Sequence, residues 1–191
     1  MPSLSINGIK LKIAKAIGIL YKVRHLLNLC TLRTLYFTFV YPYLLYGIIV
    51  WGSTYSSYLD GLFKLQKRVI RIISSSSSRA HSLPIFSSLK LLTLYQLYTF
   101  QVALFMYRFS IGDMPTVFND MFVRNEAFHN YPTRSSSHFS FPLFSSDSIR
   151  RSIRYQGVKI WNDIIININI DCSIYCFKNR VKDYLNISTT V

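Results

Sequence analysis

The chain has 191 residues, of which 50% are hydrophobic, and this suffices for one hydrophobic core of ordinary size or two small ones. It carries 22 Lys and Arg residues against 8 Asp and Glu, and internal ion pairs cannot neutralise the resulting net charge of +14. The imbalance predicts a polyanionic partner, nucleic acid before any other, with a basic surface that has no partner as the alternative.

The cysteines favour a reducing compartment. Cys30, Cys172 and Cys176 are too few for a disulfide framework, and their number is odd. Cys172 and Cys176 have the spacing of adjacent helical turns, but no second Cys/His pair completes a set of four zinc ligands. We therefore expect an intracellular protein of the cytoplasm and nucleus, with no signal peptide and no metal site.

Helices are predicted for the first part of the chain. Apolar residues recur at the helical period over residues 9–28, which Asn28 could end, and Thr31 could cap the next helix. That second helix is expected from Leu32 to about Trp51, with a bend near Pro42 because proline interrupts the backbone hydrogen bonds of a helix.

Residues 35–51 raise the question of a membrane anchor. The stretch is mostly apolar, carries no charge and approaches the length of a spanning helix. Its tyrosines lie along the middle instead of at the two ends, and Pro42 interrupts it. A buried, kinked core helix fits better, so a membrane partner is not expected. A membrane-associated protein anchored by residues 35–51 remains the alternative.

Tyr58–Ile73 is predicted to be an amphipathic helix. Its apolar face comprises Leu59, Leu62, Phe63, Gln66, Val69, Ile70 and Ile73. Basic residues at spacings of three, one and three share the opposite face, namely Lys64, Lys67, Arg68 and Arg71. Such a face can follow a phosphate backbone, whereas a merely solvated face or contact with anionic lipid are the alternatives.

Five consecutive serines indicate a division of the chain. Ser74–Ser78 cannot bury enough surface to offset the entropy lost on ordering. Residues 74–84 are therefore interpreted as a flexible linker between a helical region, residues 1–73, and a C-terminal region, residues 85–191.

The C-terminal region is expected to combine helices with a short extended element. A long helix should follow a cap at Ser87 or Ser88. The extended element is predicted within residues 138–160, although periodicity leaves the part from Ile149 onward open to strand or helix. A last helix is expected at about residues 173–185.

Four segments, in this order, resemble the C-terminal part of a reverse transcriptase from a non-LTR (LINE-type, jockey-like) retrotransposon. They are Tyr41–Gly52 (YPYLLYGIIVWG), Leu62–Ile73 (LFKLQKRVIRII), His129–Arg134 (HNYPTR) and Ser152–Asn162 (SIRYQGVKIWN). The resemblance implies a mainly α fold, in which a thumb-like helical bundle precedes a C-terminal region of helices and a short β element. It also implies that the catalytic fingers and palm are absent.

The resemblance further implies that this chain does not polymerise DNA alone. Polymerisation requires clustered carboxylates that hold two metal ions, and the family supplies them from an Asp-Asp motif in the palm. The chain contains neither Asp-Asp nor Asp-x-Asp, so Mg²⁺ is expected only in the missing palm and no cofactor in this chain. A non-functional relic of a truncated element is a further alternative.

The predicted partners are RNA and DNA as a template–primer duplex, together with the palm and fingers of an intact element. The expected nucleic-acid contacts are Lys64, Lys67, Arg68, Arg71, Arg134, Arg150, Arg151, Arg154, Tyr155 and Lys159. Trp161 is expected in the core, a place that is also open to Tyr155, and Gly157 is expected to permit a bulge or tight turn. No catalytic residue is predicted.

Overall fold

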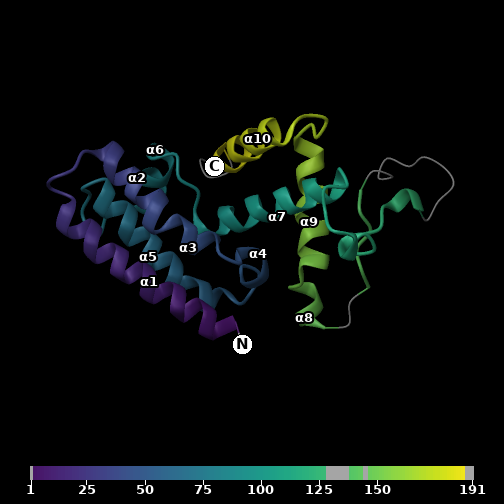
Figure 1. Ribbon diagram of the computed structural model, residues 1–191, viewed down its shortest axis with the longest axis horizontal. Coiled ribbons are helices and arrows are strands. Elements are labelled where there is room, and N and C mark those ends of the chain that lie inside the picture. Colours follow the sequence, from purple (N-terminus) through teal and green to yellow (C-terminus); the bar gives the residue numbers. More distant parts are fainter. Residues whose placement is uncertain (1, 128–137, 144–145, 188–191) are drawn as a thin grey trace. The chain divides into compact units, whose positions relative to one another are not determined.

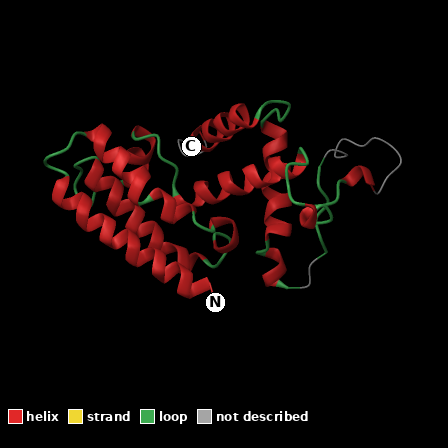
Figure 2. Cartoon of the chain, in the orientation of Figure 1, coloured by secondary structure: helices red, strands yellow, loops and turns green. Residues whose placement is uncertain are grey.

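The computed structural model describes residues 2–127, 138–143 and 146–187. As the predicted fold class requires, the described residues are mainly helical (Figures 1 and 2). The chain forms two compact units, the first ending at Leu97 and the second beginning at Tyr98. This division differs from the one inferred from the serine run, which lies inside the first unit.

Two long helices form the centre of the first unit. Helix α1 (Pro2–Val23) packs along α5 (Ser56–Ile73), as Figure 1 shows. The side chains of α1 that are buried at the helical period are Ile6, Ile9, Ile13, Ile17 and Leu20. The predicted apolar face of α5 is buried as expected except for the half-buried Phe63. An apolar stripe on each helix therefore defines this core.

The expected helix over residues 32–51 is instead divided into α2 (Leu29–Phe39), α3 (Tyr41–Leu45) and α4 (Ile48–Trp51). Pro42 lies in the first turn of α3, where a missing N–H costs nothing, and Gly47 adopts a left-handed φ of 63° before α4. The cap of α2 is Asn28, not Thr31, because the Asn28 side chain accepts from the Thr31 N–H at 2.8 Å.

This division bears on the membrane anchor that residues 35–51 suggested. Within the ranges that the structure describes, no helix has both the length and the apolar character needed to cross a bilayer. Leu44, Ile48 and Trp51 are instead buried side chains of the first unit.

A single amide fastens the segment before α7 to the core of the first unit. The Gln66 side chain is fully buried and donates through Nε2 to the Tyr36 hydroxyl at 3.1 Å and to the Leu92 carbonyl at 3.0 Å. Its Oε1 accepts from the Leu94 N–H at 2.8 Å. These three hydrogen bonds, which we call the Gln66 clasp, satisfy polar groups that are buried away from water.

The serine run and the segment after it adopt defined turns. The Ser76 N–H donates to the Arg71 carbonyl at 3.0 Å after Ser75 takes a positive φ of 52°. Helix α6 (Ser82–Ser88) follows, so Ser87 and Ser88 end a helix instead of capping one. The cap of α7 (Leu94–Ser110) is Thr93, which exchanges hydrogen bonds with Gln96 as a capping box.

The second unit is built around aromatic side chains. Its elements are the later part of α7, η1 (Thr116–Phe118), η2 (Asn125–Ala127), α8 (Asp147–Arg150), α9 (Ile153–Asn167) and α10 (Ile174–Ile187). Phe139 lies between Phe109, Phe122 and Trp161, with ring centroids 5.6 to 6.3 Å apart. Phe177 of α10 continues the cluster by stacking on Tyr107, 4.3 Å between centroids.

The short β element is reduced to one antiparallel bridge, Arg124 with Phe139, among the residues that the structure places. The region from Ile149 onward is helical, because α8 and α9 occupy it. Val158 and Ile164 of α9 are buried in the core of the unit. The expected last helix is confirmed as α10.

Candidate nucleic-acid interface

The strongest candidate surface is the basic face of α5, formed by Lys64, Lys67, Arg68 and Arg71. At 100° per residue these four positions fall within an arc of about 100°, opposite the buried stripe. Lys64 and Arg68 are exposed, whereas Lys67 and Arg71 are half-buried. The structure therefore brings together all four residues that the sequence grouped.

Contacts along the helix hold the two half-buried members in place. The Lys67 ammonium lies 4.1 Å from the centroid of the Phe63 ring, a cation–π contact. The Arg71 Nε donates to the Ala80 carbonyl at 2.9 Å, which ties the turn after α5 back to the helix. Asp60, the acidic residue one turn before Lys64, accepts from the Tyr95 hydroxyl at 3.2 Å. Among the described residues, none of the four cations of the basic face forms an ion pair.

A cavity of about 420 Å³ adjoins the C-terminal end of this face. It is lined by Tyr21, Arg24, Arg68, Arg71, Ile72, Ser76 and Ser78. Sequence reasoning missed the contribution of Tyr21 and Arg24, because they belong to the end of α1 and the turn after it. Only the packing of α1 along α5 brings these distant positions to Arg68 and Arg71.

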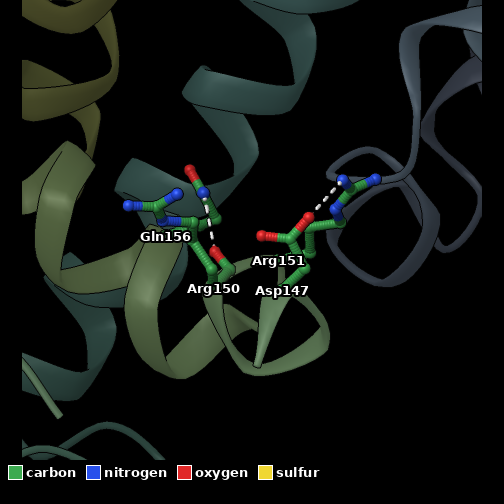
Figure 3. A network of polar contacts seen from close by, with 4 residues as sticks. All are labelled: Asp147, Arg150, Arg151 and Gln156. Atoms are coloured by element: carbon green, nitrogen blue, oxygen red, sulfur yellow. Dashed lines mark hydrogen bonds and ion pairs between the residues drawn. The ribbon is translucent and has the colours of Figure 1, made fainter. Parts of the chain in front are cut away.

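Among the described residues, the predicted basic contacts of the C-terminal region are not gathered on a single helix face. Arg151 pairs with Asp147 at 3.3 Å, and the Gln156 amide donates to the Arg150 carbonyl at 2.9 Å (Figure 3). Arg154 and Lys159 are exposed, but a separation of five residues turns them about 140° apart around α9. Arg134 lies outside the described residues.

The motif at residues 152–162 serves the core of the second unit. Trp161 is buried, as expected, at 1% exposure. Asn162 grips the Phe139 backbone twice, because its Oδ1 accepts from the N–H at 3.1 Å and its Nδ2 donates to the carbonyl at 3.0 Å. Tyr155 is half-buried beside Phe141, with centroids 5.3 Å apart, so packing accounts for its position.

Gly157 is not at a bulge or turn but within α9, and its role is close packing. A Cβ built there would lie 2.9 Å from the Met106 Sδ and 3.3 Å from the Phe122 Cε1. A hydrogen atom at this position therefore lets α9 approach α7 and the segment around Phe122.

The described residues offer no metal centre, since nowhere among them do three His, Cys, Asp or Glu side chains gather. Desolvation raises the pKa of the Cys172 thiol, and the neighbouring Cys176 raises that pKa further. A raised pKa lowers the thiolate fraction and with it the nucleophilicity of the sulfur.

Comparisons with known proteins identify no relative of this chain. No protein-family model matches the chain, and no curated protein or solved structure is significantly similar to it.

Proposed function

We propose that this chain is a nucleic-acid-binding module that contacts the phosphate backbone of an RNA–DNA duplex through the basic face of α5. We further propose that it derives from the thumb and post-thumb region of a non-LTR reverse transcriptase. The order of the four motif segments supports this origin, and the chain itself carries out no polymerisation.

The observation that carries the proposal is the clustering of four cations on one face of α5, where Asp60 is the one carboxylate beside them and, among the described residues, forms no ion pair with them. Residues 1–80 contain 11 Lys and Arg and, as their one acid, Asp60. Each phosphate that a cation contacts releases condensed counterions, so binding gains free energy from entropy and weakens as salt rises. Such contacts fix position on the duplex but do not read its sequence.

A salt series tests the proposal. We expect an RNA–DNA hybrid to bind with a slope of log K against log salt of about −3 to −4, since each of the four contacts contributes about −0.9. Binding should be insensitive to sequence. A slope near zero, or weak binding at low salt, would contradict the proposal.

Two double variants test whether binding depends on the basic face of α5 or only on the net charge of the protein. Lys64→Gln with Arg68→Gln removes two exposed charges from the basic face of α5. Lys15→Gln with Lys22→Gln removes two exposed charges from α1, on the side turned away from its buried stripe. The first variant should reduce the slope by about 2, and the second should change it far less. Equal losses would assign binding to net charge alone.

A further inference from the structure

The cavity beside the basic face holds three guanidinium groups from two helix ends. Arg24 comes from the turn after α1, while Arg68 and Arg71 come from the last two turns of α5. The hydroxyl-bearing Ser76 and Ser78 complete one side. Among the described residues, no acidic side chain lines the cavity, so the described lining carries three positive charges and no negative one.

Hydrogen bonds donated by Nε orient two of the three arginines. The Arg24 Nε donates to the His25 Nε2 at 3.0 Å, and its guanidinium carbon lies 4.0 Å from the centroid of the Tyr21 ring. The Arg71 Nε donates to the Ala80 carbonyl at 2.9 Å. In both residues the terminal nitrogens of the fork remain for a ligand, and preorganised forks lose less entropy per bond formed.

This arrangement suits a phosphate monoester. A monoester carries up to two negative charges at neutral pH and presents three acceptor oxygens, which Arg forks bind by charge-assisted hydrogen bonds. A phosphodiester within a strand has one charge and continues on both sides. The concave site, with cations converging from two elements, therefore favours the end of a strand over its middle.

We propose that the Arg24–Arg68–Arg71 cavity binds a phosphate monoester, and that in the protein's function this is the terminal phosphate of a nucleic-acid strand. The second part rests on the proposed function, because Arg68 and Arg71 belong to both the cavity and the basic face. A strand that follows α5 thus ends at the cavity, which places the end of the strand on the protein without reading its sequence.

The test compares short single-stranded DNAs of one sequence that carry a 5′-phosphate, a 3′-phosphate or hydroxyls at both ends. At least one phosphorylated form should bind about tenfold more tightly than the hydroxyl form. Arg24→Gln should bring that preference to within about twofold. Lys22→Gln removes an equal charge nearby but outside the cavity and should leave the preference unchanged. Circular dichroism of both variants confirms that they fold.

Equal affinity for all three DNAs would overturn the cavity proposal while leaving salt-dependent backbone binding intact. If none of the DNAs binds, inorganic phosphate decides on the cavity alone, while the proposed function is decided separately by the RNA–DNA hybrid. A melting temperature that phosphate raises above its value in chloride of equal ionic strength, with the rise lost in Arg24→Gln, would uphold the site. No such rise would refute it.

Discussion

Replacing Gln66 by leucine tests the hydrogen-bonded centre of the first unit. The substitution roughly preserves the size of the side chain and removes three buried hydrogen bonds, of 2.8, 3.0 and 3.1 Å. It leaves the Leu94 N–H and the Leu92 carbonyl buried without this partner, and each such group costs about 1–3 kcal/mol. Burying leucine recovers part of that sum, so we expect a loss of about 2–4 kcal/mol in the free energy of unfolding, against about 5–15 kcal/mol for a typical domain.

Urea denaturation followed by circular dichroism measures this loss as a lower midpoint at unchanged slope. Tyr36→Phe removes the partner of one bond only and should cost about 0.5–1.5 kcal/mol, and the double variant should lose less than the sum. The exposed neighbour Lys64→Gln should stay within about 0.5 kcal/mol of the original protein. A Gln66→Leu protein as stable as the original would refute the clasp. A non-cooperative transition in the unaltered chain would favour the relic.

Two other predictions follow from the packing and the ionisation of the core. Gly157→Ala should destabilise the protein by about 1–3 kcal/mol relative to Gly18→Ala, measured by the same urea denaturation. A Cβ at Gly157 meets Met106, whereas nothing lies within 4 Å of a Cβ at Gly18. Equal effects of the two substitutions would contradict the close approach of α9 to Met106. Burial raises the pKa of Tyr36 well above its usual range. The buried, protonated Tyr36 hydroxyl stabilises the fold fully below about pH 10, the pKa of tyrosine in the unfolded chain, and this stabilisation is lost as the pH rises further. The free energy of unfolding should therefore fall less steeply at alkaline pH in Tyr36→Phe than in the original protein.

The sequence predicted a helix accurately where the residues of that helix alone show its pattern of apolar and charged faces, and less accurately elsewhere. The helices α5 and α10 were predicted to within about two residues, because each has one apolar stripe and an opposite charged face. The sequence predicted a bend near Pro42, where α2 ends and α3 begins, but the break at Gly47 was missed, since apolar residues continue through it. The Thr93–Gln96 capping box had a readable signature but was overlooked in favour of nearby serines.

The candidate surfaces also differ in how far they could be predicted from the sequence. The basic face of α5 lies on one helix, so residue spacing alone sufficed to group its members. The Arg24–Arg68–Arg71 cavity joins positions more than forty residues apart and required the packing of α1 on α5. The C-terminal basic residues looked like a cluster in sequence, but Arg154 and Lys159 lie about 140° apart around α9.

Ser152–Asn162, one of the segments that carry the resemblance, is not where we place the binding. In Ser152–Asn162, Gly157 permits a close approach, Trp161 fills the aromatic core and Asn162 holds the Phe139 backbone. These roles explain why the residue types are specific, since each depends on size or on a paired donor and acceptor that few side chains provide. The charges of α5 need only sign and spacing, which many sequences satisfy. This segment therefore bears on folding, while the proposed contacts to nucleic acid rest on the less distinctive pattern of cations along α5.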